Sequence, residues 1–275
     1  MAWFTRSSQF SLLAIALTLG LAMNTPVQAQ TRLGSSPLSN QIPNQWEPPT
    51  TPTPAPINKD SGGRRGPCIA DPNFNKAPIA LVPPSGVGTT MAEYPTVFWY
   101  MPKTTAWGVE FRLSDANQNV VYSTTYAFAH YTEKTADGKY EDEFVVGAPG
   151  IMSLTLPASG GVSPLEMGKD YRWQLRLICD PQDITGDVYI EGGFKRVAVD
   201  PNLKTRIQQA KPEDLVTLYA NQRLWYETID ILIDLRRDRP NDKNFTDAWN
   251  KLLRSVGLEI ITEESLFEEA RTVNN

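Results

Sequence analysis

The sequence predicts a mainly β protein with an α-helical C-terminus: an immunoglobulin- or fibronectin-like antiparallel β-sandwich followed by a docked helical hairpin. Between residues 68 and 199, short apolar segments alternate with Gly, Pro, Asn and Asp, which is typical of a sandwich. Between residues 200 and 275 the apolar spacing changes to three and four, as in helices. The predicted strands are 79–83, 96–101, 108–113, 120–128, 144–146, 151–156, 171–178 and 188–199.

Strand 171–178 carries the clearest sandwich pattern. Leu165-x-x-Gly168-x-x-Tyr171 precedes it, and this pattern is similar to the tyrosine corner of immunoglobulin-like domains. Within the strand, apolar and polar residues alternate, so one face is predicted to be buried and the other to face water. The predicted inward residues are Tyr171, Trp173, Leu175 and Leu177, and the outward residues are Arg172, Gln174 and Arg176.

Strand 96–101 differs because both of its faces are apolar. Such a strand is usually covered on both sides, by the opposite sheet and by a second layer. The second cover is either the C-terminal helices or a ligand. Phe98, Trp99 and Tyr100, with Trp225 and Trp249 in the helical region, are therefore the candidate binding surface, and packing in the core is the competing interpretation.

The helical region is predicted to contain two main helices. Apolar residues from Leu215 to Ile233 indicate one continuous helix, and those from Phe245 to Val256 indicate a second. Pro240 lies between them and favours a hairpin. A short acidic helix is expected from Thr262 to about Arg271. The region is too small for a helical-repeat adaptor, which needs at least three repeats.

Residues 1–29 are predicted to be a cleavable signal peptide, with cleavage near Ala29 and Gln30. Arg6 precedes an apolar run from residue 12 to 23, and small residues follow. The alternative, a membrane anchor, needs about 20 apolar residues. Residues 30–67 are predicted to be a disordered linker, because seven prolines lie between residues 37 and 56. Trp46 is expected to be exposed there or to serve as a docking point.

Two cysteines, Cys68 and Cys179, are the only ones in the chain. An even number of cysteines in an exported protein favours a disulfide. Two separate buried thiols are the alternative. A bridge would stabilise the fold by about 4–5 kcal/mol in the chain-entropy model.

No pattern of catalytic residues is found. His130 is the only histidine, which excludes sites that need two, and no G-x-S-x-G or P-loop motif occurs. Two acidic segments, 141–143 and the one that holds Asp180, Asp183 and Asp187, are the remaining candidates for paired carboxylates or cation binding. Charge runs beside turns are usually solvated, so no catalytic residue, metal ligand or cofactor is predicted.

The predicted signal peptide is followed, in order, by motifs at residues 62–68, 80–83, 93–102, 171–179, 224–228 and 249–258. This order of motifs resembles the cyanobacterial domain-of-unknown-function family 928. The resemblance covers most of residues 61–260. It implies an exported protein of a cyanobacterial periplasm or cell surface, with no activity or catalytic residues to carry over.

Together these features predict an exported, non-enzymatic binding or scaffolding protein of the cell envelope, periplasmic or extracellular. The expected partner is an envelope protein or a glycan. The formal net charge of −5 argues against nucleic acid, and no second apolar segment is long enough to span a membrane once the signal is removed. The alternative function is an envelope protein that binds or cleaves carbohydrate.

Overall fold

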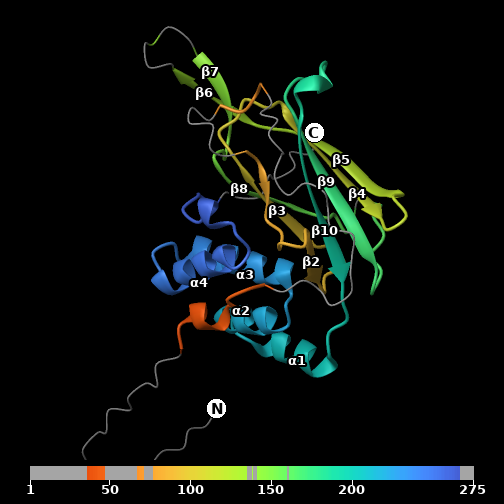
Figure 1. Ribbon diagram of the computed structural model, residues 1–275, viewed down its shortest axis with the longest axis vertical. Coiled ribbons are helices and arrows are strands. Elements are labelled where there is room, and N and C mark those ends of the chain that lie inside the picture. Colours follow the sequence, from red (N-terminus) through yellow and green to blue (C-terminus); the bar gives the residue numbers. More distant parts are fainter. Residues whose placement is uncertain are drawn as a thin grey trace, which may run out of the picture. The chain divides into compact units, whose positions relative to one another are not determined.

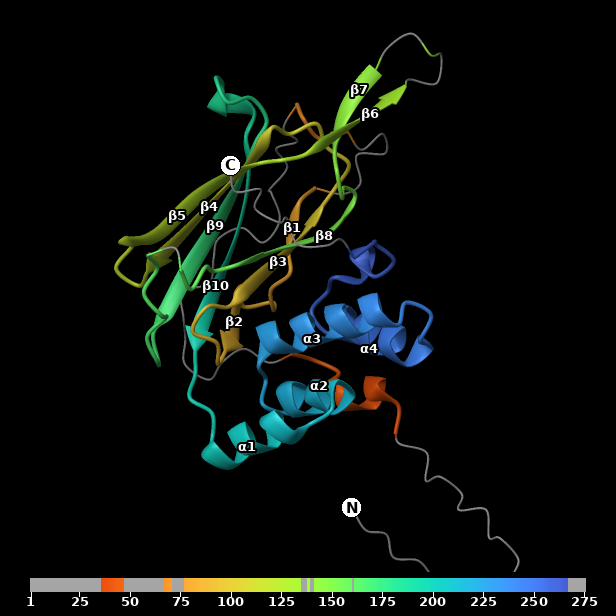
Figure 2. The same ribbon diagram turned by 180° about the vertical axis from the view of Figure 1, so that it is seen from behind.

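The strands of the computed structural model form two sheets of a β-sandwich and a separate two-stranded hairpin (Figures 1 and 2). The structure describes residues 36–46, 67–70, 77–134, 138, 141–159 and 161–266. The first sheet holds β1 (Ile79–Ala80), β3 (Thr96–Met101) and β8 (Gly150–Thr155) in that spatial order. The second holds β2 (Val87–Thr90), β10 (Val188–Arg196), β9 (Asp170–Ile178), β4 (Gly108–Asp115) and β5 (Val120–Ala127).

The strand order is that of an immunoglobulin- or fibronectin-like sandwich, which confirms the predicted fold class. Between β3 and β9 the chain crosses from the first sheet to the second after β3, returns to the first at β8, and crosses again after β8, as in a Greek key. Among the strands that the structure describes, the pairings are antiparallel except that of β2 with β10, in which Val87 lies opposite Gly193. The sequence missed β2 because it has only four residues, one of them glycine. It also missed β6 (His130–Lys134), which pairs with β7 (Glu141–Val145).

β9 follows its predicted alternation. Tyr171, Trp173, Leu175 and Leu177 are buried, whereas the three polar residues between them are partly exposed. The hydroxyl of Tyr171 accepts a hydrogen bond from the backbone N–H of Glu166 at 2.9 Å. This bond to the chain before the strand is the predicted tyrosine corner.

Four helices follow the sandwich: α1 (Pro201–Gln209), α2 (Pro212–Asn221), α3 (Trp225–Asp238) and α4 (Lys243–Arg254). They lie at the end of the sandwich where β2 and β3 lie (Figure 2). The single helix predicted from Leu215 to Ile233 is wrong, because the chain breaks between α2 and α3 at Arg223, which has a positive φ of 58°. None of the described helices has the length and apolar character needed to cross a membrane.

Short 3-10 helices complete the described chain. They are η1 (Leu38–Gln41), η2 (Ile184–Gly186) and η3 (Glu259–Ile261). The helix expected from Thr262 is not formed over residues 262–266, where Ser265 instead accepts a hydrogen bond from Ile151 of β8 through its carbonyl, at 2.8 Å. Residues 267–275 lie outside the described residues.

The predicted disordered linker does not hold for residues 36–46, which we call the N-terminal strap. η1 lies against α2 and α4, and the apolar side chains of Leu38, Ile42 and Trp46 are 8%, 1% and 4% exposed. Trp46 is therefore buried rather than exposed. The spacing of four residues between these side chains is the signal that the proline content concealed. The predicted signal peptide, 1–29, and residues 47–66 lie outside the described residues.

Candidate functional site

The five aromatic residues predicted as a binding surface are all in the core. Phe98, Trp99, Tyr100, Trp225 and Trp249 are 2%, 2%, 3%, 0% and 0% exposed. The interpretation of these residues as a contact surface is wrong, and the packing interpretation is correct. The physical reason is that α3 contacts β3 as well as β2, so the helices provide the second cover that a strand with two apolar faces needs.

Trp225 and Tyr226 join α3 to the sandwich. The indole N–H of Trp225 donates to the carbonyl of Leu81 at 2.9 Å. The hydroxyl of Tyr226 donates to the carbonyl of Gly193 at 2.8 Å and accepts from the indole N–H of Trp173 at 3.2 Å. A Cβ on Gly88 would lie 2.7 Å from the Trp225 ring, so this close approach of helix and strand requires glycine there.

Glu227, in the first turn of α3, adds a buried carboxylate to this junction. Its Oε1 accepts hydrogen bonds from the hydroxyl of Thr90 at 2.6 Å and from the backbone N–H groups of Met91 at 2.8 Å and Ala92 at 3.2 Å. Its Oε2 has no hydrogen-bond partner among the described residues. Burial raises the pKa of Glu227 despite these hydrogen bonds. The contacts hold α3 to the end of β2.

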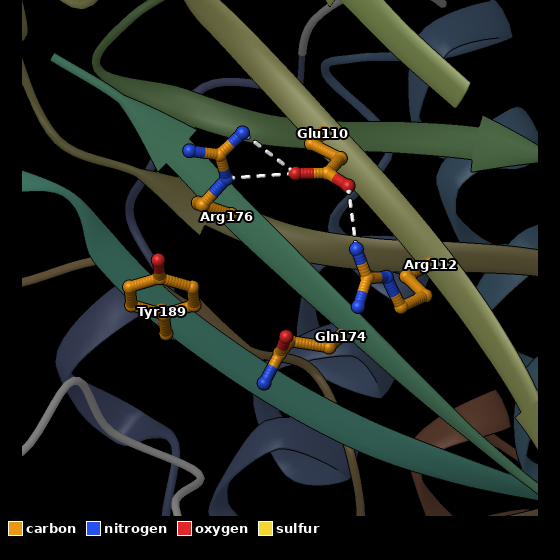
Figure 3. Close-up of a pocket in the computed structure, with 5 residues that line it drawn as sticks. All are labelled: Glu110, Arg112, Gln174, Arg176 and Tyr189. Atoms are coloured by element: carbon orange, nitrogen blue, oxygen red, sulfur yellow. Dashed lines mark hydrogen bonds and ion pairs between the residues drawn. The ribbon is translucent and has the colours of Figure 1, made fainter. Parts of the chain in front are cut away.

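A candidate site lies on the outer face of the five-stranded sheet. Five side chains from three adjacent strands line a groove of about 440 Å³ (Figure 3). The alternation of β9 predicts that Gln174 and Arg176 face water. Their grouping with the other lining residues depends on strand register, which pairs Glu110 with Arg176 and Arg176 with Tyr189. The lining residues are Glu110 and Arg112 of β4, Gln174 and Arg176 of β9, and Tyr189 of β10.

Charged groups of opposite sign are linked along this face. Arg176 contacts Glu110 at 2.7 Å and Asp187 at 2.8 Å, and Arg112 contacts Glu110 at 3.1 Å. Burial opposes the charge of both Arg176 and Glu110. The hydrogen bonds outweigh it, so the pKa of Arg176 is raised and that of Glu110 is lowered. The side chain of Arg112 remains 50% exposed and Tyr189 is 42% exposed, so both can contact a ligand.

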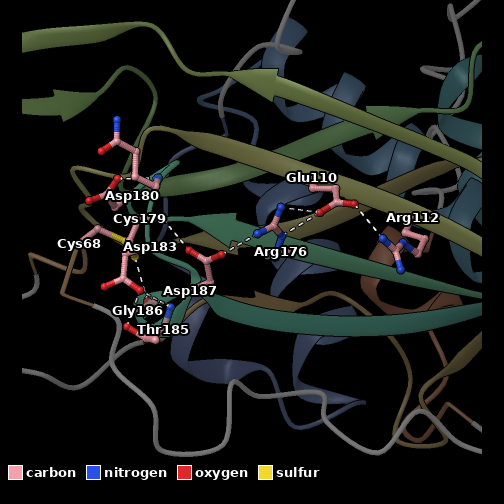
Figure 4. Close-up of polar contacts among 11 residues, drawn as sticks. Cys68, Glu110, Arg112, Arg176, Cys179, Asp180, Asp183, Thr185, Gly186 and Asp187 are labelled. Atoms are coloured by element: carbon pink, nitrogen blue, oxygen red, sulfur yellow. Dashed lines mark hydrogen bonds and ion pairs between the residues drawn. A yellow bond between two sulfur atoms is a disulfide. The ribbon is translucent and has the colours of Figure 1, made fainter.

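Asp187 connects this groove to the predicted disulfide, which is present between Cys68 and Cys179 (Figure 4). The buried carboxylate of Asp187 accepts from Arg176 and, at 3.0 Å, from the backbone N–H of Cys179. The bridge attaches the segment before β1 to the end of β9. The groove is therefore anchored at one end by a covalent link.

The acidic candidates in the loop after β9 make local hydrogen bonds. In the loop after β9, Asp183 accepts hydrogen bonds from the backbone and side chain of Thr185, and these bonds lower its pKa. Asp180 accepts from the backbone of Gln182 at 2.8 Å. Within the described part of the chain, no three His, Cys, Asp or Glu residues gather in a way that could hold a metal ion.

The remaining candidates lie on the hairpin of β6 and β7. Asp142 and Glu143 are exposed on β7. The ring of His130 lies with Nε2 2.8 Å from the carbonyl oxygen of Ala106, so this contact ties the base of the hairpin to the sandwich. No contact in the described residues joins His130 to the groove.

Comparison with known proteins identifies the family. The model for the Domain of Unknown Function (DUF928) matches residues 60–266. The chain belongs to the DUF928 family. No curated protein matches the chain of this DUF928 protein.

Two solved structures with low sequence identity show distant similarity to the DUF928 chain. The fn3 domain of human collagen alpha-1(XX) chain is 12% identical with a TM-score of 0.22, over 40% of this chain and 77% of that one. Astrotactin-2, described as a vertebrate-specific, perforin-like membrane protein, is 10% identical with a TM-score of 0.24, and the match covers 67% of this chain and 35% of that one.

Proposed function

We propose that this DUF928 protein is an exported, non-enzymatic binding or scaffolding protein of the cyanobacterial cell envelope, and that the groove on the outer face of the five-stranded sheet is its contact surface. The observation that carries the proposal is the groove itself. It places an exposed aromatic ring, an amide and a half-exposed guanidinium on one rigid sheet, and these groups are suited to recognition.

Two further features support export. The first is the predicted signal peptide of residues 1–29. The second is the disulfide, which closes a loop with a sequence separation of 111 residues and would stabilise the fold by about 5 kcal/mol in the chain-entropy model. Disulfides persist in oxidising compartments such as the periplasm. The proposed location is therefore the periplasm or the cell surface.

The groove favours a polar partner with a negatively charged or hydroxyl-rich surface. Only one nitrogen of Arg112 contacts Glu110, so its guanidinium can donate two hydrogen bonds to one carboxylate of a partner. The ring of Tyr189 provides an apolar surface beside these groups. An acidic protein segment fits both features and is the partner class that we propose.

A carbohydrate-binding function is the second candidate, because an exposed ring beside an amide and a guanidinium also suits a sugar. The ring would be Tyr189, which lines the groove. Trp107, at 41%, is the only exposed tryptophan among the described residues, and it is not one of the lining residues. Of the described residues that line the groove, Glu110 is the one with a carboxylate. Glycoside cleavage needs two, so we propose binding rather than cleavage.

The test is a crosslinking pull-down from an envelope extract with wild-type protein, the double variant Arg112→Glu/Tyr189→Ala and the control Lys204→Glu on exposed α1. We expect a protein partner to be captured by the wild type and the control and lost with the double variant. Equal capture by all three, or no capture, would count against the groove. Binding to envelope polysaccharide that depends on Tyr189 would favour the carbohydrate alternative.

A further inference from the structure

The N-terminal strap packs against α2, α4 and Trp225 of α3, and we call the surface that it covers the strap groove. Leu38, Ile42 and Trp46 point into it at a spacing of four residues and are nearly fully buried, while Asn40, Asn44 and Gln45 between them are exposed. One side of a short segment thus binds and the other faces water. This is how peptide ligands with regularly spaced anchors lie in a groove.

Trp46 is the largest of the three anchors and is 4% exposed. Its ring meets that of Trp225 edge to face, with 4.9 Å between the centroids. The guanidinium of Arg223 lies 5.8 Å from the centroid of the Trp46 ring, and its Nη1 donates to the carbonyl of Gln45 at 3.4 Å. Aromatic and arginine contacts of this kind are typical of the energetic centre of an interface.

Backbone groups of the strap are recognised at the ends of helices. The N–H of Leu38 donates to Oδ1 of Asn244, in the first turn of α4, at 2.9 Å. The N–H of Trp46 donates to the carbonyl of Ser255, at the end of α4, at 3.4 Å. The groove therefore contacts both the side chains and the backbone of the strap along the length of α4.

Arg223 is held in an uncommon backbone conformation at this site. Its φ of 58° lies in the left-handed region, which is unfavourable for a residue with a side chain. The hydroxyl of Thr89 in β2 donates to its carbonyl. The same residue that breaks α2 from α3 thus presents its guanidinium to Trp46, and the sandwich holds it in place.

The residues that line the strap groove lie within the family domain, and the strap itself lies before it. The DUF928 model begins at residue 60, so Arg223, Asn244 and Ser255 lie inside the family domain while the strap lies outside it. We propose that this groove is a peptide-binding site, that residues 36–46 are its ligand within the chain, and that it binds the same segment of a second copy when the two exchange.

When two copies exchange straps, each contact is replaced by the same contact from the other copy, so the contacts themselves favour neither strap. The covalent connection between the strap and the rest of its chain therefore decides which strap is bound. A segment on the same chain has an effective concentration in the millimolar range for short linkers. The strap of the same chain therefore excludes that of a second copy until its connection is cut or its anchor is weakened. The proposal does not depend on the function of the outer groove.

The experiment uses the full mature chain with a protease site inserted at Thr50, cut after folding, and a fluorescent synthetic peptide of residues 36–46. Anisotropy should show no binding to the uncut chain and saturable one-to-one binding to the cut chain. The peptide variant Trp46→Ala should bind at least about 30-fold more weakly. The matched variant Asn40→Ala, at an exposed position, should bind as the wild type does.

A second measurement covers the case in which the cut strap never leaves. The intact chain with Trp46→Ala has a weakened strap and should bind the wild-type peptide without cleavage, and the added change Arg223→Ala should reduce that binding. Circular dichroism reports whether each protein is folded. The proposal is overturned if the cut chain and the intact Trp46→Ala chain are both folded and neither binds the peptide. It is also overturned if the Trp46→Ala peptide binds as tightly as the wild-type peptide.

Discussion

Two polar networks of this protein involve the five-stranded sheet but differ in burial. The outer-face network runs from the buried Asp187 through the partly exposed Arg176 and Glu110 to the half-exposed Arg112. The junction network lies between the sandwich and α3 and consists of Trp173, Trp225, Tyr226, Glu227 and their backbone partners. The first is built mainly from ion pairs and the second from hydrogen bonds between buried groups.

Burial decides how much a polar contact contributes to the stability of the fold. An exposed ion pair contributes little to stability because water and salt screen it. A buried donor or acceptor that loses its partner carries the full cost of its desolvation. The junction network is therefore expected to hold the helices to the sandwich, whereas the outer face can exchange its contacts for those of a ligand.

The largest effect is expected for Tyr226→Phe. It leaves the carbonyl of Gly193 and the indole N–H of Trp173 without their partner, so the free energy of unfolding should fall by about 1–3 kcal/mol. Urea denaturation measures this. The matched change Tyr189→Phe removes a hydroxyl from the outer face and should alter stability by less than about 0.5 kcal/mol. Equal effects of the two would remove the contrast between the networks.

The second prediction concerns pH, because the two networks shift a glutamate in opposite directions. Burial raises the pKa of Glu227 above 4.5, so its contribution to stability is present below pH 4.5 and is lost as pH rises through the raised value. In Glu110 the arginines lower the pKa, so its contribution is present above pH 4.5 and is lost as pH falls through the lowered value.

Unfolding free energies measured against pH for Glu227→Gln and Glu110→Gln test these signs. Above pH 4.5, the stability of Glu227→Gln relative to wild type should increase as the pH is raised. Below pH 4.5, the stability of Glu110→Gln relative to wild type should increase as the pH is lowered. Parallel slopes, or a flat difference for Glu227→Gln, would contradict the assignment of the buried carboxylate.

The smallest effect is expected for Arg112→Ala. Its side chain is half exposed and, within the described part of the chain, its ion pair is with Glu110, so the free energy of unfolding should change by less than about 0.5 kcal/mol. Lys204→Ala on α1 is the exposed control. A loss above about 1 kcal/mol from Arg112→Ala alone would show that the outer-face network is structural.

Much of the sandwich could be predicted because its signals are local. The alternation in β9 and the spacing from Leu165 to Tyr171 are properties of neighbouring residues, and both are found in the structure. The candidate site could be predicted only in part. The water-facing side of β9 follows from alternation, but the contacts of Arg176 with Glu110 and Asp187 depend on which strands are neighbours and in what register.

The aromatic residues show why the rest could not be read from the chain. An apolar side chain on a strand or helix looks the same whether it meets another element or a ligand, and Trp46 and Trp99 were both ambiguous for this reason. Burial is a property of the partner surface. Only the docking of α3 and of the strap decided that Phe98, Trp99 and Trp225 are core residues.

The amino-acid sequence alone thus determined the fold class, the two cysteines able to pair and the polarity of each face of β9, because these follow from period, composition and number. Tertiary structure decided the course of the strap, the break at Arg223 and the grouping of the outer groove. Each of these depends on contacts between segments far apart in the chain, such as Trp46 with Trp225 and Thr89 with Arg223.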